Sequence, residues 1–223
     1  MTYGTIKTRI ADDLARSDLT SQIATAVLNA IKHYERRRFY FNTRVATDTF
    51  ALVANQEYYG SADLAVIPNL ITIDDMYATV GGVRYHILPT TFEGIAEAQD
   101  GLLTRDPPFN YAYHAQQIRM YPIPSAARTV TMATHYRLTA LSADGDANAW
   151  TTDAEDLIVR RAEWDLYSFT VKDIESATAA RAGEMEALAA LQRETRLRRS
   201  VRELAMPMEL GGWSRRPDIM TGY

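Results

Sequence analysis

The sequence predicts an α+β protein in which both ends of the chain form a helical bundle and the middle forms a β-rich insertion. Near each end, apolar residues recur every three or four positions, which is the period of a helix packed on one side. In the middle of the chain the period becomes two, as in a strand with one buried face. We therefore expect a bundle of residues 1–42 and 151–204, a β-rich insertion of residues 43–150 and an extended C-terminal tail of residues 205–223.

Two amphipathic helices are predicted at the start of the chain. Ile6, Ile10 and Leu14 lie four residues apart, and residues 23–34 repeat this spacing after a short turn. The two helices should form a hairpin. Three consecutive arginines, residues 36–38, follow the second helix, where cations interact favourably with the negative end of the helix dipole. An intersubunit or nucleic-acid contact is the alternative role for these arginines.

The β-rich insertion contains two segments with clear alternation. The residues expected to share one strand face are Ile71, Ile73 and Tyr77 in the first segment and Val130, Met132 and Tyr136 in the second. Gly81 and Gly82 predict a two-residue hairpin turn, because glycine adopts positive φ without strain. Thr90 with Glu93 predicts a capped short helix at about residues 91–99.

Helical periodicity returns after Trp150. Thr152 and Glu155 have the spacing of a capping box. The apolar stripe that follows consists of Ile158, Ala162, Leu166 and Phe169, widened by Trp164, Tyr167 and Val171. A stripe this broad predicts packing on two sides, so Trp164 and Tyr167 are our candidate subunit-interface residues.

A second helix is predicted after a break at residues 172–173. It is rich in alanine, glutamate and arginine, which are good helix formers, and it should end near Glu203. Its inward side chains are expected to be Met185, Leu188 and Leu191.

The composition argues against most enzyme classes. The chain has no cysteine, and it lacks the glycine-rich loops and the nucleophile elbow that bind phosphate or position a catalytic serine. Its four histidines do not have the spacing of zinc ligands. Asp144 and Glu155 span a twelve-residue segment similar to a calcium loop, but its sixth position is Ala149 where glycine is needed. The sequence therefore predicts no catalytic, cofactor-binding or metal-binding residue, and no cofactor.

Paired carboxylates keep one enzymatic alternative open. Asp74 and Asp75, or the acids at Asp153, Glu155 and Asp156, could supply the two groups that hydrolyse a glycosidic bond. The second group is also explained as negative charge at a helix N-terminus. A virion-associated cell-wall hydrolase is therefore an alternative to a protein without catalysis.

The charge of the chain is unevenly distributed. The net charge is −4, but five arginines and one glutamate between residues 193 and 202 give that segment +4, so the rest carries −8. A net negative chain is a poor match for a protein whose main task is to bind nucleic acid through its phosphates. A soluble DNA-binding protein therefore stays only a second alternative. The arginines suit a solvated helix end, an acidic protein surface or DNA. Because no signal pattern and no run of about 18 apolar residues occurs, we expect a soluble protein made in the host cytoplasm.

The order of motifs in residues 106–150 is distinctive. Asp106-Pro107-Pro108 is followed by "YPIP" at residues 121–124, by "YRLTALS" at residues 136–142 and by a tryptophan before an acidic helix start. Together with residues 3–8 and 17–20, this order resembles the head-to-tail adaptor proteins of tailed bacteriophages. The resemblance is closest to adaptors of short-tailed phages.

The resemblance implies a structural virion protein located at the neck, between head and tail. It implies a ring of about twelve copies beneath the portal protein, joined to a tail or nozzle protein, with a channel through which genomic DNA passes without sequence-specific binding. It implies no membrane partner. In related adaptors the C-terminal region embraces the portal, so the portal-interface residues expected here are Arg193, Arg196, Arg199, Arg202, Met206, Met208, Leu210 and Trp213.

Overall fold

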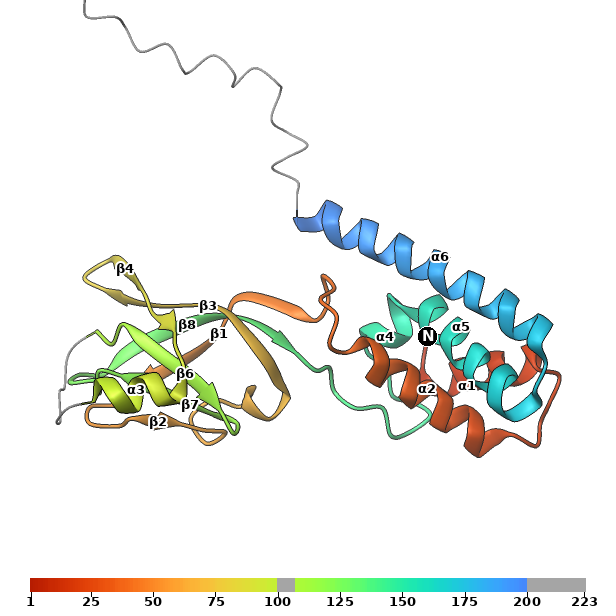
Figure 1. Cartoon of the computed structure of the whole chain (residues 1–223), viewed down its shortest axis with the longest axis horizontal. Coiled ribbons are helices and arrows are strands. Elements are labelled where there is room, and N and C mark those ends of the chain that lie inside the picture. The colour runs from red at the N-terminus through yellow and green to blue at the C-terminus, as the bar shows by residue number, and fades with distance from the viewer. Residues whose placement is uncertain (100–106, 200–223) are drawn as a thin grey trace, which may run out of the picture.

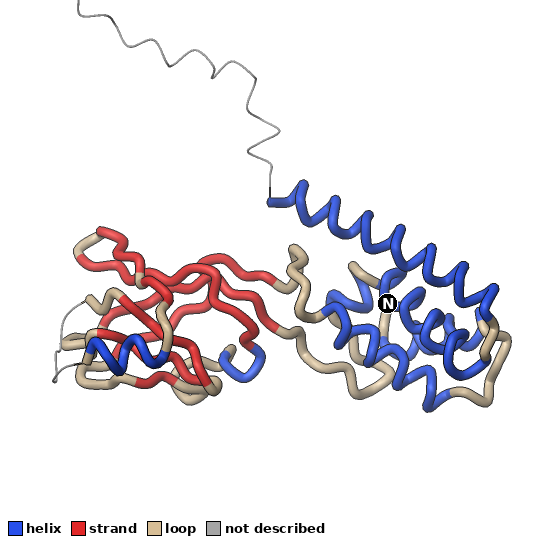
Figure 2. The backbone as a smooth tube through the Cα atoms, viewed as in Figure 1, coloured by secondary structure: helices blue, strands red, loops and turns tan. Residues whose placement is uncertain are grey.

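The computed structural model describes residues 1–99 and 107–199. Helices gather at one end of the molecule and strands at the other, and two extended connections join the two parts (Figures 1 and 2). The connections are residues 35–42 and residues 137–148. The predicted α+β class is confirmed.

The helical part draws its elements from both ends of the chain. They are α1 (Tyr3–Asp13), α2 (Thr20–Tyr34), α4 (Ala149–Thr152), α5 (Glu155–Asp165), the π-helix η2 (Leu166–Val171) and α6 (Ile174–Arg199). One hydrophobic core joins them, and it includes Ile6 and Ile10 from α1 and Ile158 and Ala162 from α5. The spacing that predicted α1 and α2 is therefore the spacing of their buried faces.

The strands form two four-stranded sheets. The first has the order β1-β8-β3-β4, built from β1 (Thr43–Leu52), β8 (Arg128–Tyr136), β3 (Leu70–Val80) and β4 (Val83–His86). The second has the order β2-β7-β6-β5, built from β2 (Tyr58–Tyr59), β7 (Gln117–Tyr121), β6 (Asn110–His114) and β5 (Leu88–Pro89). Only the β5–β6 pair is parallel among the described strands. The short helices η1 (Ile67–Asn69) and α3 (Phe92–Ala98) complete this part.

The core of the β part is separate from the core of the helical part. Leu52, Tyr59, Met76, Ile118 and Val130 are among its fully buried members, and they come from both sheets. Apolar side chains from the two sheets thus close on one another, as in a sandwich.

Two short-range predictions in the β part hold. Gly81 and Gly82 have φ of 57° and 83° and join Val80 to Val83 across a two-residue turn. The short helix α3 is present, but its cap is Thr91, whose hydroxyl accepts from the Gly94 N–H at 3.0 Å. The cap is thus one residue later than predicted.

The predicted face of β3 is wrong. Val130 and Met132 do share the buried face of β8, as expected. Opposite them on β3, however, the register shifts between Ile73 and Asp75. Ile73 pairs with Thr134, on the buried face, while Tyr77 pairs with Thr131, on the other face. One extra residue in a strand moves every later side chain to the opposite face, and no local pattern announces it.

The predicted capping box of Thr152 with Glu155 is also wrong. The helix starts earlier, at α4, where the Asn148 side chain accepts from the Trp150 N–H at 2.9 Å and pairs reciprocally with Thr151. Glu155 is instead the first residue of α5, which lacks a side-chain cap. Asparagine is as good a cap as threonine, so the earlier start is chemically reasonable.

Phe169 and Met185 were predicted to point inward, but both are exposed. Ile158, Ala162 and Leu166 form the expected stripe, but the chain then winds as a π-helix, and Val171 packs on the core in place of Phe169. A π-turn takes one extra residue and so shifts the stripe. In α6 the position next to Met185 is buried instead.

Glu184 is that buried residue of α6. Its carboxylate accepts from the hydroxyl of Tyr34 and lies 2.5 Å from Arg181 and 3.5 Å from Arg161. Leu191 is buried and Leu188 is partly buried, as predicted. Burial and the neighbouring carboxylate raise the pKa of Tyr34. A buried carboxylate needs several partners, and these come from three helices.

Of the arginines after α2, Arg38 connects the two parts. Arg38 lies 2.5 Å from Asp74 and 3.0 Å from the Thr72 hydroxyl, both on β3. The guanidinium of Arg37 lies 5.4 Å from the centre of the Tyr34 ring.

Within the described residues, no helix is long and apolar enough to cross a bilayer.

Candidate interaction surfaces

The carboxylates considered for hydrolysis are held in structural ion pairs. Asp74 contacts Arg38, and Asp75 lies 3.1 Å from the His86 ring. Glu155 and Asp156 both bind Arg9 of α1, the latter at 3.0 Å. These contacts tie β3 to the connection and to β4, and α5 to α1, which gives these four carboxylates a role in the fold.

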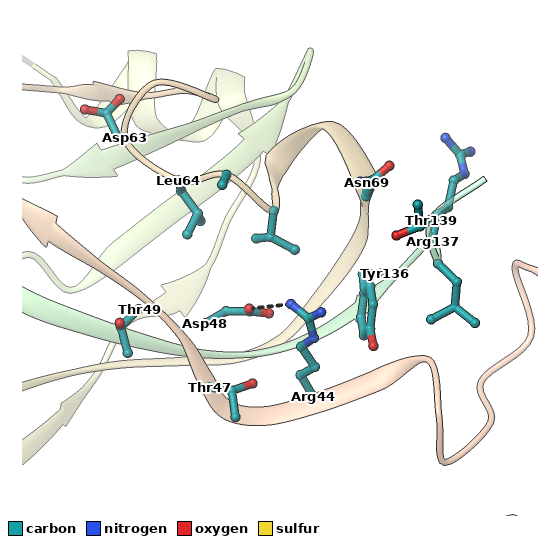
Figure 3. Close-up of a pocket in the computed structure, with 13 residues that line it drawn as sticks. Arg44, Thr47, Asp48, Thr49, Asp63, Leu64, Asn69, Tyr136, Arg137 and Thr139 are labelled. Carbon is teal, nitrogen blue, oxygen red and sulfur yellow. Dashed lines mark hydrogen bonds and ion pairs between the residues drawn. The ribbon is translucent and has the colours of Figure 1, made fainter. Parts of the chain in front are cut away.

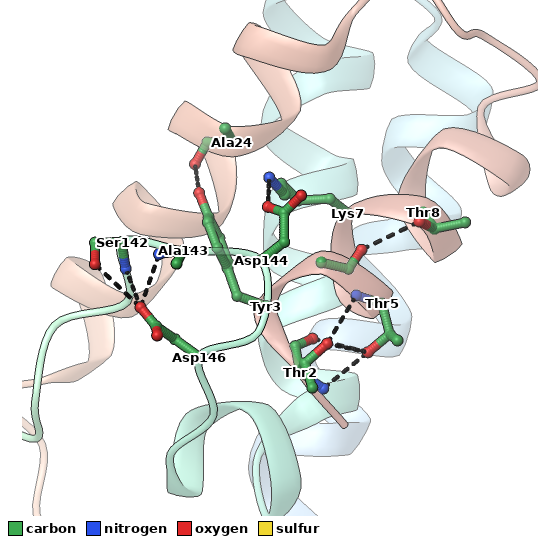
Figure 4. Close-up of polar contacts among 11 residues, drawn as sticks. Thr2, Tyr3, Thr5, Lys7, Thr8, Ala24, Ser142, Ala143, Asp144 and Asp146 are labelled. Carbon is green, nitrogen blue, oxygen red and sulfur yellow. Dashed lines mark hydrogen bonds and ion pairs between the residues drawn. The ribbon is translucent and has the colours of Figure 1, made fainter.

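The loop that resembles a calcium site anchors the start of the chain (Figure 4). Asp144 accepts from the ammonium of Lys7 at 2.5 Å, and its carbonyl accepts from the Gly4 N–H at 2.9 Å. The Asp146 carbonyl accepts from the Tyr3 N–H at 2.8 Å. A Cβ at Gly4 would lie 2.9 Å from the Cβ of Asp144, so only glycine fits this approach.

The side chains of this loop have further partners inside the chain. The Asp146 carboxylate accepts from the backbone N–H of Ser142 and of Ala143, both at 2.7 Å, and these bonds lower its pKa. Among the residues that the structure describes, no group of three or more acidic, histidine or cysteine side chains is placed to hold a metal ion. The four histidines lie on four different elements.

A polar pocket opens where β1 bends beside the end of β8 (Figure 3). Asp48 is buried there and accepts from the Thr134 hydroxyl and from Arg44, whose Nη1 lies 3.1 Å away. The Arg44 guanidinium also lies 4.0 Å from the centre of the Tyr136 ring. The register shift between Val45 and Asp48 leaves this stretch irregular, and the ion pair supports it.

Trp164 of α5 lies between two cations on a partly exposed surface. The Arg161 and Arg181 guanidinium groups are 4.4 Å and 5.2 Å from its ring. Phe169 meets it edge-on at 5.9 Å. Tyr167 instead donates its hydroxyl to the Asp13 carbonyl at 3.2 Å, so its polar end is used within the subunit. The two candidate interface residues therefore lie on different sides of the turn.

A largely apolar groove runs beside Trp164. Its other walls come from α6 and include Ile174, Thr178, Arg181 and Met185, and its volume is about 500 Å³. Ile174 is 83% exposed and Met185 is 63% exposed, while Phe169 next to the groove is 67% exposed. We call this surface the apolar groove. Sequence reasoning identified Trp164 but placed Phe169 and Met185 in the core, and it did not single out Ile174.

A polar groove lies on the other side of α6. It is lined by Asp13, Arg160, Glu163, Tyr167 and Glu186, among others. Glu163 is only 1% exposed; one oxygen accepts from Arg160 at 2.8 Å, while Oε1 has no hydrogen-bond partner. Burial, followed by the nearby Asp13 carboxylate, raises the pKa of Glu163 to about 7.

The arginines near the end of α6 divide into two kinds. Arg198 lies 2.5 Å from Glu194, and its guanidinium is 3.7 Å from the centre of the Tyr40 ring, so it holds the helix to the connection. Arg193 and Arg196 are exposed and make no ion pair within the described residues. Arg199 is the last described residue.

The rest of the predicted portal interface falls on Arg202 and the tail. Arg202, Met206, Met208, Leu210 and Trp213 all lie outside the described residues.

Comparison with known proteins decides which family this fold represents. The SU10 adaptor protein family model matches residues 1–207, nearly the whole chain. The chain belongs to the SU10 adaptor protein family. The resemblance to phage head-to-tail adaptors is thereby confirmed, and this adaptor is a structural component of the virion neck. None of the curated proteins compared with it matches.

Membership in an adaptor family directs attention to surfaces. Portal and tail proteins are the partners that it implies. In the described part of this adaptor, the features suited to such contacts are the apolar groove and the exposed arginines of α6.

Proposed function

We propose that this adaptor forms a ring of about twelve copies beneath the portal and joins it to a tail or nozzle protein, leaving a channel for the genome. The observation that carries the proposal is the family match over residues 1–207. The work of such a protein is binding, without catalysis. A closer relation to adaptors of short-tailed phages is part of the same proposal.

Ring closure requires two different complementary patches on each subunit, because a heterologous contact joins one patch to another. We propose Trp164 and Tyr167 as residues of one patch. Trp164 supports this best, since its ring borders the apolar groove and large aromatic residues dominate interface energies. The β-rich insertion of residues 43–150 is the candidate for the second patch, with residues 1–42 and 151–204 acting as the bundle that carries the first.

The portal contact is proposed for the C-terminal end of the chain. Arg193, Arg196, Arg199 and Arg202 are spaced three residues apart, which places them on roughly one side of a helix and favours an acidic partner surface. The apolar residues of the tail, Met206, Met208, Leu210 and Trp213, would then fill pockets on the portal. Replacing Trp213 by alanine should weaken binding by about 2 kcal/mol or more.

The charge distribution supports passive passage of DNA. Outside residues 193–202 the chain carries −8, and an acidic channel wall would repel phosphates. DNA would then pass without sequence-specific binding.

Electron microscopy of this adaptor mixed with its phage's portal tests the proposal. We expect one ring of adaptor density on the tail side of the portal, with cyclic symmetry. A two-fold dimer, or no density on the portal, would contradict it. Tight, salt-sensitive binding to duplex DNA would favour a DNA-binding protein, and cleavage of peptidoglycan lost on replacing Asp153 or Glu155 would favour a hydrolase.

A further inference from the structure

The apolar groove is an exposed apolar surface of the kind that binds another segment or protein. Ile174, Met185 and the adjacent Phe169 are each more than 60% exposed, and the first two line a hollow bordered by Trp164. Scattered exposed apolar residues are ordinary, but a group of them around a groove marks a binding site. No described segment of the chain covers it, since these values are those of the folded subunit.

We propose that in the free subunit the apolar groove binds the chain's own residues 206–213. This segment reads Met-Pro-Met-Glu-Leu, followed by two glycines and a tryptophan. In an extended backbone alternate side chains face the same side, so Met206, Met208 and Leu210 would project together. Methionine adapts to irregular apolar surfaces, and Pro207 disfavours a helical interior.

The chain after Arg199 is long enough for this segment to reach the groove. Met185 and Ile174 precede Arg199 by 14 and 25 residues, which is about 21 Å and 37 Å along a helix. An extended chain covers about 3.4 Å per residue, so Met206 and Leu210 reach about 24 Å and 37 Å from Arg199. A chain that turns back along α6 therefore brings these side chains beside the groove. A reversal of two or three residues moves the contact toward Leu210 and Trp213.

Self-binding has a consequence for assembly. The same segment is proposed above to bind the portal, and the same groove contains Trp164, proposed as a subunit contact. When the portal takes the segment, the groove becomes free for a neighbouring subunit, so rings form on the portal and not in solution. This consequence rests on the proposed function, whereas the self-contact itself does not.

Disulfide trapping tests the self-contact, because the chain has no cysteine of its own. The full-length variant with Thr178→Cys and Met208→Cys places one thiol in the groove and one in the segment. A disulfide needs Cα atoms within about 4.4–6.8 Å. The matched control combines Met208→Cys with Ala179→Cys, the adjacent exposed residue, which lines the polar groove instead. We expect the intramolecular disulfide to form about tenfold faster in the first variant than in the control.

Three outcomes would overturn the proposal. The two variants could form disulfides at equal rates; adding Leu210→Asp could leave the faster rate unchanged; or the product could be a dimer joining two isotopically distinct chains, which would make a second copy the occupant. Circular dichroism checks that each variant is folded; of the four positions changed, Thr178 and Ala179 are exposed, and Met208 and Leu210 are in the tail. Because the measurement uses the free subunit, its failure would leave the adaptor function standing.

Discussion

Replacing Glu163 by glutamine should change the pH dependence of stability. Glu163 is almost fully buried, and burial together with the Asp13 carboxylate raises its pKa from 4.5 to about 7. A raised pKa means that folding favours the protonated acid. Its contribution to the free energy of unfolding is therefore fully present below pH 4.5 and is lost as the pH rises through 7. Glutamine resembles the protonated acid and cannot ionise.

The size of the effect follows from the shift. One pKa unit corresponds to about 1.4 kcal/mol, so a shift from 4.5 to about 7 gives at most about 3 kcal/mol. Near pH 5 the wild type and Glu163→Gln should have similar stability. Above pH 8 the variant should be more stable by up to about 3 kcal/mol, even though it replaces the charged partner of Arg160.

Urea unfolding of both proteins at several pH values between 5 and 8.5 measures this difference. Other titrating groups are common to the two proteins and cancel in the comparison. Glu186→Gln, at an exposed position in the same polar groove, is the control and should give a difference that does not vary with pH. A constant difference for Glu163→Gln, or one that falls as the pH rises, would refute the reasoning.

Three further predictions concern packing and portal binding. Phe169→Ala should change stability by no more than about 0.5 kcal/mol, whereas Leu166→Ala should cost about 2–5 kcal/mol, as measured by denaturation. Deleting residues 205–223 should leave the circular dichroism spectrum unchanged but abolish stable binding to portal, as measured by sedimentation. If the truncated protein still forms rings on the portal with undiminished affinity, the docking surface must be sought in the α1–α2 hairpin. The double variant Arg196→Glu, Arg199→Glu should attach to the portal more slowly than the wild type. The difference between the two attachment rates should become smaller at high salt, because screening weakens long-range attraction.

The periodicity of apolar residues correctly predicted the helices that pack on a single face. In α1 and α2 the apolar spacing survives intact, because no residue interrupts the helix between Ile6 and Ile10 or between Ile23 and Val27. The turn at Gly81 was equally readable, since its backbone requires positive φ. In both cases the determining interaction is local.

Two of the failures share one physical cause, which is a single residue added within an element. The register shift after Ile73 and the π-helix at residues 166–171 each displace the apolar pattern without changing the composition around them. Glu184 is a different case. Its burial depends on Tyr34, Arg161 and Arg181, which no local pattern connects to it.

The candidate surface was predictable in part. The breadth of the stripe drew attention to Trp164, which is partly exposed, while its role at a subunit interface stays a prediction. The π-helix hid the exposure of Phe169, and the burial of Glu184 hid that of Met185, since both exposed residues are apolar and fall at helical spacing. The cluster of positive charge near the end of α6 was visible from the sequence alone, because counting charged residues along the chain is enough to find it.

The two hydrophobic cores of this adaptor are separate, so the link between its two parts contains no shared core. Each core is complete within its own part. Two stretches of backbone cross between the parts, together with ion pairs such as Arg38–Asp74 and Arg137–Glu35 and hydrogen bonds such as that from the Tyr136 hydroxyl to the Phe41 carbonyl. Exposed pairs of this kind contribute about 0–1 kcal/mol each. Tilting one part against the other therefore breaks few strong interactions. In the ring proposed above, small tilts repeated in every copy would change the width of the proposed channel while both cores stayed intact.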